Sequence, residues 1–343
     1  MLLSLMFKSR ALNYVIFSLL IITSEFSFAL RLDDSYTGVW QGIEIMGCDL
    51  EIANQIRKTI PLDIGSEFKL SNKEKYRDIC NKHVKKYLPN ENVECGFIFF
   101  TDGVAYMNIQ VLPREYNNQF RAIPIPDHPV PKIPDEVNKV YMKIQDRMDE
   151  MAKRTGTFPT EIYDGGFIDF TDPILHELAQ ELTRIAFDYN EVILEVVRYE
   201  PDPMTRADAA NLLSWTRHPE NFKYIVKWDL LSDSYLGVRN NLARSFVFLI
   251  QKVESKEILN DLLQLYCKMV SLPEHTDRNK ALYSIQEVLE KDPSLVNAMD
   301  QACIGHIHYI AEASILSNVG GVAKEILEFM ELNKLEKNTH HHS

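Results

Sequence analysis

The chain has 343 residues, of which 45% are hydrophobic and 25% are charged. This is the composition of an ordinary globular protein with room for two or three domains. The formal net charge is −12, and an acidic surface repels phosphate backbones, so we expect no nucleic-acid partner.

The first 29 residues are typical of a secretory signal peptide. Lys8 and Arg10 supply positive charge, an apolar run follows over Ala11–Ile22, and Ser27–Ala29 fits the small-x-small cleavage rule. The run is about 12 residues long, whereas a membrane span needs ~20. We therefore expect an exported chain, periplasmic or secreted, with no transmembrane segment after cleavage of residues 1–29. An uncleaved anchor is the alternative.

Five cysteines bear on how the exported chain is stabilised. Export permits disulfides, and an odd count leaves at least one thiol free. Cys80 with Cys95 is the pair we single out, because it would join a helix to the strand beneath it. Buried, unpaired cysteines are the alternative. The full set is Cys48, Cys80, Cys95, Cys267 and Cys303.

Residues 30–120 alternate between strand and helix patterns. Asp49 and the capping box at 71–74 indicate two helix starts, and Asp102-Gly103 between apolar runs predicts a tight hairpin. The order is β-α-α-β-β, which predicts an α+β domain. The expected elements are a strand at 36–46, helices at 50–60 and 71–88, and strands at 93–100 and 104–112.

This order resembles a polypeptide-transport-associated (POTRA) domain. The resemblance depends on IEIMG at 43–47, IRKTIPLDIGSEF at 56–68 and FFTDGVAYMNIQV at 99–111. In that family these are the first strand, a helix running into a glycine loop, and the closing hairpin. The family usually occurs as tandem copies, whereas this chain has one. The resemblance implies an open sheet edge that accepts a strand from a partner.

Residues 121–171 are expected to join the two halves of the chain. Five prolines within 123–134 predict an extended, semi-rigid linker, because proline fixes φ and lacks an N–H donor. A charged helix is expected at 135–154, and a loop from there to residue 171.

Residues 172–333 carry the pattern of paired helices. Asp-Pro at Asp172, Asp202 and Asp292 predicts helix starts, with aspartate as the cap. A further helix over 232–250 would be capped by Asp233 or Ser234. Partner helices are expected at 191–198, 221–231, 255–270 and 294–316, a closing helix at 322–332, and a disordered tail at 334–343.

Three of these helices align on an arginine followed by small and apolar residues. Arg206, Arg239 and Arg278 are separated by 33 and 39 residues, a period typical of stacked helix pairs. The pattern resembles HEAT/armadillo repeats, most specifically over 233–244. The region 164–253 also resembles an uncharacterised group of exported bacterial proteins. The resemblance implies an all-α solenoid of HEAT-like pairs, with no inherited activity.

The polar residues of these helices have two interpretations. Arg206, Arg239 and Arg278, with Asp233, are expected to connect neighbouring repeats through charged hydrogen bonds. Alternatively, Arg239 with Asn240 and Asn241 forms a binding surface. The asparagine pair has no counterpart in the other two copies.

Patterns for metal or covalent chemistry are incomplete in this sequence. Asp164, Asp169 and Asp172 are oxygen ligands at short spacing, but the spacing differs from that of a calcium loop. His176-Glu177 lacks the second histidine of a zinc motif, and in Cys303-x-x-His306-x-His308 the two histidines point different ways on a helix.

We therefore expect no cofactor and no catalytic residues. The sequence favours a non-catalytic, exported scaffold that binds a protein partner through a helical-repeat surface and a sheet edge. The alternatives are a metal-dependent hydrolase and a secreted effector that binds a host protein.

Overall fold

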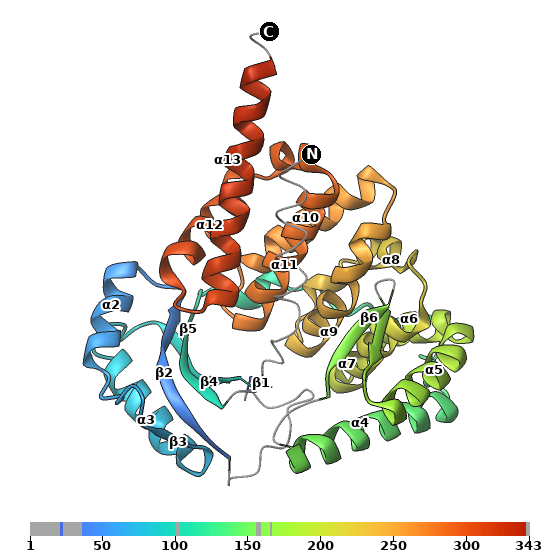
Figure 1. The fold of residues 1–343 in the computed structure, drawn as a ribbon, viewed down its shortest axis with the longest axis horizontal. Helices are drawn as coiled ribbons and strands as arrows, with labels where there is room; N and C mark the ends of the chain where they lie inside the picture. Colours follow the sequence, from blue (N-terminus) through green and yellow to red (C-terminus); the bar gives the residue numbers. More distant parts are fainter. Residues whose placement is uncertain (1–20, 23–35, 101–102, 156–158, 165–166, 341–343) are drawn as a thin grey trace.

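The structure is a computed structural model that describes residues 21–22, 36–100, 103–155, 159–164 and 167–340. It is 64% helical, which confirms a mainly α chain, and it contains a small curled sheet and a separate pair of strands (Figure 1). No helix in the described ranges is long and apolar enough to cross a membrane. The expected signal segment lies outside these ranges except for Ile21–Ile22.

A mixed sheet forms the N-terminal part, which we call the sheet unit. Its order is β1-β4-β5-β2-β3, in which β2 and β5 are parallel and the other neighbours antiparallel. Helices α2 (Leu50–Thr59) and α3 (Lys73–Val84) belong to the same unit. The strands are β1 (Ile21–Ile22), β2 (Thr37–Met46), β3 (Glu67–Lys69), β4 (Asn92–Phe99) and β5 (Val104–Leu112).

The two faces of this sheet join different cores. Alternate residues of β5, such as Met107 and Ile109, pack in the core of the sheet unit with Trp40 of β2, as the period of a strand requires. On the opposite face, Met46 and Ile98 pack in the core of the helices that follow. The sheet is therefore buried on both sides. Strand β3 and the short β1 were not expected from the sequence.

The helices after residue 134 form the helical region, which curves in an arc so that α12 (Gln301–Ala313) returns to β2 (Figure 1). Asp172 and Asp202 cap their helices as expected, accepting from the backbone N–H groups of Leu175 and Thr205. The α-helices are α4 (Asp135–Thr155), α5 (Pro173–Asp188), α6 (Asn190–Tyr199), α7 (Pro203–Leu212), α8 (Asn221–Lys227), α9 (Leu236–Phe246), α10 (Lys256–Val270), α11 (His275–Lys291), α12 (Gln301–Ala313) and α13 (Val322–His340).

Three expectations for this region need correction. The helix expected at 294–316 is divided, because Asp292 caps only a 3₁₀ turn and Asp300 then caps α12. The expected loop before residue 171 contains two paired antiparallel strands, β6 (Glu161–Asp164) and β7 (Phe167–Phe170). Helix α13 continues to His340 through what was expected to be a disordered tail, and that segment contains no proline or glycine to stop it.

Two disulfides connect described elements. Cys80 of α3 is bonded to Cys95 of β4, the pair singled out from the sequence. A second disulfide, which we did not anticipate, joins Cys267 of α10 to Cys303 of α12. Cys48 is a free thiol.

Candidate functional site: an arginine series that ends in a pocket

Arg206, Arg239 and Arg278 lie near the starts of α7, α9 and α11 and are at most 2% exposed. Each donates from Nη1 to backbone carbonyls five or six residues upstream, which holds the preceding turn against its helix. The acceptors are Glu200 and Pro201 for Arg206 (2.8 and 3.0 Å), Asp233 for Arg239 (2.7 Å), and Leu272 and Pro273 for Arg278.

The other edge of the guanidinium, formed by Nε and Nη2, binds a carboxylate in the first two positions. Arg206 donates from both nitrogens to Asp233, at 3.2 and 3.0 Å. Arg239 donates to Asp277 at 3.1 and 2.6 Å. Both are buried, two-point ion pairs that connect successive helix pairs.

Asp233 pairs with arginine rather than capping α9. Its carboxylate accepts from Arg206 and also from Arg121, whose Nη2 lies 2.6 Å away. The helix itself begins at Leu236, where no side chain caps it. Two guanidinium groups thus converge on one fully buried carboxylate.

Arg121 belongs to the linker, and it fixes the linker against the helical region. It also donates to the carbonyls of Val197 and Arg198, at 3.0 and 3.2 Å, and its backbone N–H donates to the Ser232 carbonyl at 2.7 Å. The neighbouring Phe120 ring lies 4.7 Å from the Arg239 guanidinium carbon. The chain's own linker therefore covers the helical surface beside Arg239.

Of the two neighbouring asparagines, Asn241 is buried between helices and Asn240 lies at the surface. Asn241 is 3% exposed and donates to the carbonyl of Ala207 on α7 at 2.8 Å. Asn240 is partly exposed, and its amide lies 3.4 Å from Asn241 Oδ1. Because Arg239 and Asn241 are buried in helix packing, the binding surface suggested for these three residues is reduced to Asn240.

Glu274 places a second acid beside the Arg239–Asp277 pair. One of its oxygens lies 3.9 Å from Arg239 Nη2. Burial and the neighbouring Asp277 raise the pKa of Glu274 to about 9. This carboxyl group is therefore protonated at neutral pH and leaves Asp277 as the counter-charge of Arg239.

Arg278 keeps the hydrogen bonds from Nη1 to the backbone carbonyls upstream. In the part of the chain that the structure describes, it lacks the carboxylate that binds Nε and Nη2 of the other two arginines. Within the described residues, neither its Nε nor its Nη2 has a hydrogen-bond acceptor, although both atoms are buried. The next segment in the series, 314–323, contains no acidic residue. The carboxylate-binding edge of Arg278 therefore has no partner from the helical region.

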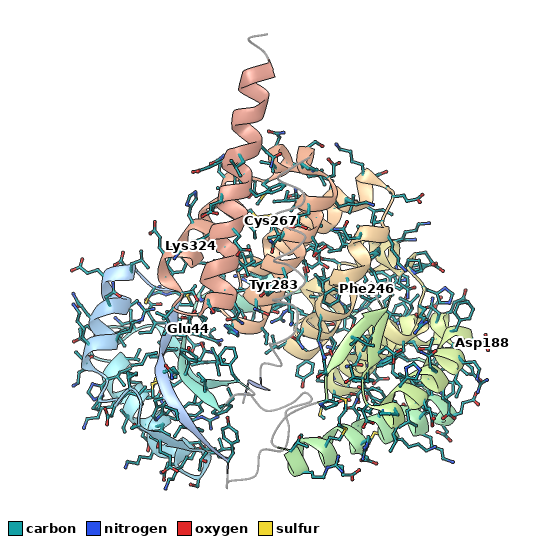
Figure 2. The ribbon with its side chains drawn as sticks, in the orientation of Figure 1. Glu44, Asp188, Phe246, Cys267, Tyr283 and Lys324 are labelled. Atoms are coloured by element: carbon teal, nitrogen blue, oxygen red, sulfur yellow. A yellow bond between two sulfur atoms is a disulfide. The ribbon has the colours of Figure 1, made fainter. Side chains whose placement is uncertain are left out.

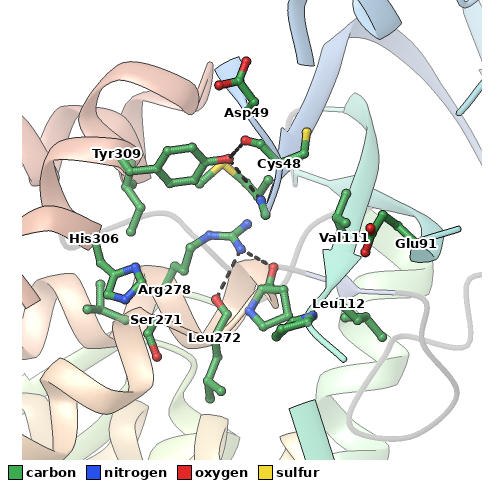
Figure 3. A pocket seen from close by; sticks show the side chains of 16 residues that line it. Cys48, Asp49, Glu91, Val111, Leu112, Ser271, Leu272, Arg278, His306 and Tyr309 are labelled. Atoms are coloured by element: carbon green, nitrogen blue, oxygen red, sulfur yellow. Dashed lines mark hydrogen bonds between the residues drawn. The ribbon is translucent and has the colours of Figure 1, made fainter. Parts of the chain in front are cut away.

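Arg278 lines a pocket between the sheet unit and the helical region, which we call the Arg278 pocket (Figure 3). Its volume is about 450 Å³. The guanidinium projects between Cys48 and the backbone of Leu272 (Figure 3). Much of the lining is apolar, with Met46, Val111, Leu112, Pro113, Val270, Leu272, Pro273 and Ile310.

Two contacts from α12 hold the walls of the pocket together. The Tyr309 hydroxyl donates to the Cys48 carbonyl at 2.7 Å and accepts from the Gly47 N–H at 3.0 Å. Gly47 has φ 87°, and an added Cβ there would lie 2.3 Å from the Val111 carbonyl oxygen, so the turn requires glycine.

Glu44 supplies the main opposite charge near Arg278. It is fully buried on β2, where β2 meets the C-terminal helices (Figure 2). Its oxygens accept from Ser314 Oγ at 2.7 Å and the Ile315 N–H at 2.9 Å. Burial raises the pKa of Glu44, and the Arg278 charge is the largest opposing effect. Glu44 therefore interacts with Arg278 electrostatically and, among the described residues, accepts none of its hydrogen bonds.

The remaining candidates from the sequence are engaged elsewhere. Asp169 accepts from His176 and Gln180, and Asp172 caps α5 and pairs with Arg147. The side chain of Asp164 lies outside the described residues. Cys303 is in a disulfide, so it is not a thiolate ligand beside His306 and His308. No group of three metal-ligating side chains occurs in the part of the chain that the structure describes.

Sequence reasoning placed the three arginines in register but did not indicate the pocket. Arg278 was expected to connect repeats as the other two do, and the signal against this was the acid-free stretch after α12. Glu44 and Tyr309 carried no signal, because their partners are more than 250 residues away. No family model, no curated protein and no solved structure matches this chain.

Proposed function

We propose that this protein is a non-catalytic, exported binding protein that receives a strand from a protein partner at the outer edge of β4. The observation that carries the proposal is the incomplete strand pairing along this edge. The chain's own Ile21–Ile22 pairs antiparallel with Ile98 and Phe99 there. Within the described residues, positions 92–97 of the same edge pair with no other strand.

Removal of a signal peptide at 1–29 would expose the rest of this edge. Unpaired N–H and C=O groups along a strand are a template for an added strand. The POTRA-like order of the sheet unit is consistent with this mode of binding. The linker covers the surface of the HEAT-like helices near Arg239. We therefore place the binding of the partner at the sheet edge and not at this helical surface.

The free thiol is a poor candidate for a covalent nucleophile. Cys48 is the one free cysteine among the described residues and it lines the Arg278 pocket. Burial raises its pKa to about 11, so it is protonated at neutral pH and is a weak nucleophile.

Site-specific photo-crosslinking in the expressing cells tests this proposal. A photoreactive residue at exposed Glu94 on β4 is compared with one at Lys82, which is exposed on α3 of the same unit. We expect a defined adduct from position 94 only, in a chain whose N-terminus has been processed near residue 30. Equal adducts from both positions, or none from 94, would contradict strand addition at β4.

A further inference from the structure

We propose that the Arg278 pocket binds the carboxylate of a small monocarboxylic acid with an apolar body, through Nε and Nη2 of Arg278. The inference is independent of strand addition at β4. It rests on the chemistry of the pocket walls and on the comparison of three arginines in one local frame. By local frame we mean an arginine near the start of its helix whose Nη1 donates to backbone carbonyls five or six residues upstream.

The first two arginines show what this frame is built to bind. In both, the carbonyl contacts of Nη1 orient the guanidinium so that its Nε–Nη2 edge meets a carboxylate at two points. Arg278 has the same Nη1 contacts. Its Nε–Nη2 edge is therefore oriented for the same planar, two-oxygen group.

The donors on that edge are buried in the described structure and lack an acceptor. Arg278 is 2% exposed, and neither Nε nor Nη2 has a hydrogen-bond partner among the residues that the structure describes. An unsatisfied buried donor costs about 1–3 kcal/mol, and more when the group is charged. Glu44 reduces the electrostatic part of this penalty, but its oxygens are bound by Ser314 and Ile315. A carboxylate that moves aside the atoms covering this edge from the pocket side would satisfy both donors.

The walls indicate what is attached to that carboxylate. The lining is mainly aliphatic side chains and prolines, and the volume of about 450 Å³ falls in the range of small-molecule sites, roughly 300–1,000 Å³. The Tyr309 hydroxyl is already engaged as donor and acceptor. The pocket therefore offers one charged anchor and an apolar space beside it.

Charge at the pocket selects against more than one negative group. The exposed acids Asp49 and Glu91 are part of the lining, and the whole chain carries a net charge of −12. A second negative group would lie beside these acids and meet repulsion, whereas a single carboxylate would be paired with the Arg278 guanidinium.

Calorimetric titration of the full chain, purified after export, tests the inference. The probes are octanoate, its neutral methyl ester, succinate and inorganic phosphate. We expect octanoate to bind at least about tenfold more tightly than the other three, which corresponds to about 1.4 kcal/mol. Equal binding of octanoate and the ester, or no binding of octanoate, would overturn the proposal.

Two variants locate the binding. Arg278→Gln should weaken octanoate binding by at least about tenfold. Because that change also removes contacts to the 272–273 backbone, His306→Trp serves as a second variant: it fills the pocket from an exposed position on α12. His308→Trp, on the same helix and outside the lining, is its matched control. We expect loss with His306→Trp and wild-type affinity with His308→Trp. Unchanged affinity in both, or equal loss in both, would contradict the assigned pocket.

Discussion

The first two arginines of the series and the third share a local frame and differ in what completes it. Arg206 and Arg239 meet carboxylates supplied by the chain itself, at Asp233 and Asp277. Arg278 meets a pocket between the sheet unit and the helices. Arg206 and Arg239 therefore hold helix pairs together, whereas Arg278 has two donors available. The difference is that the segment following Arg278 in the series, 314–323, supplies no acid.

The paired positions should be the most sensitive to loss of the acid. Asp233→Asn leaves Arg206 and Arg121 converging on a neutral amide in a fully buried site. We expect a loss of about 3–5 kcal/mol in the free energy of unfolding, as for other broken buried ion pairs. Urea denaturation of the variant and wild type measures it. A loss below about 1 kcal/mol, the size expected of an exposed pair, would contradict the structural role of Asp233.

Asp277→Asn should be milder than Asp233→Asn, although both pairs are buried. Glu274 lies 3.9 Å from Arg239, and losing the Asp277 charge removes the second of the two main effects, after burial, that raise the pKa of Glu274. We expect Glu274 to ionise more readily in this variant and to replace part of the lost counter-charge. The double variant Asp277→Asn/Glu274→Gln removes this substitute, and we expect it to lose about 3–5 kcal/mol. Equal losses in the single and double variants would show that Glu274 does not take over.

The pH dependence of stability should report Glu274. Its pKa is raised from an ordinary value of 4.5 to about 9 in the folded chain. Folding therefore favours the protonated form, so its contribution is complete below about pH 4.5 and is lost as the pH rises toward 9. Denaturation at pH 5, 7 and 9 should show a shallower decline for Glu274→Gln than for wild type. Parallel declines would contradict the assignment.

The asparagine pair gives the smallest effects and a matched control. Asn241→Ala leaves the Ala207 carbonyl without its 2.8 Å donor and should cost about 1–3 kcal/mol. Asn240→Ala, at a partly exposed position, should stay within about 0.5 kcal/mol. Thermal denaturation of the two variants side by side measures the difference, and the reverse order would contradict the division between packing and surface.

Much of the fold was predictable because its signals are local. The Asp-Pro caps at 172 and 202, the Asp-Gly hairpin and the linker prolines act within a few residues of themselves. The register of Arg206, Arg239 and Arg278 followed from sequence spacing alone. Asp292 shows the limit of such signals, because the same cap starts only a short turn there.

The candidate site depended on contacts that leave no local trace. Asp277 is one acid among many and is marked as the partner of Arg239 only by packing across 38 residues. The contact of Arg121 with Asp233 spans 112 residues, so the sequence did not show that the linker would cover the helical surface. The Arg278 pocket requires β2 and α12 to meet, which is a property of the whole chain.

The most direct test of the comparison is to observe the three guanidinium groups separately. In ¹⁵N-arginine-labelled protein, assigned by Arg→Lys variants, the Nε–H resonances of Arg206, Arg239 and Arg278 are followed during titration with octanoate. We predict that the Arg278 resonance shifts and becomes protected from solvent exchange, while those of Arg206 and Arg239 stay unchanged. An Arg278 resonance that is already protected and does not respond would show that the chain itself completes the third position, and would contradict the account.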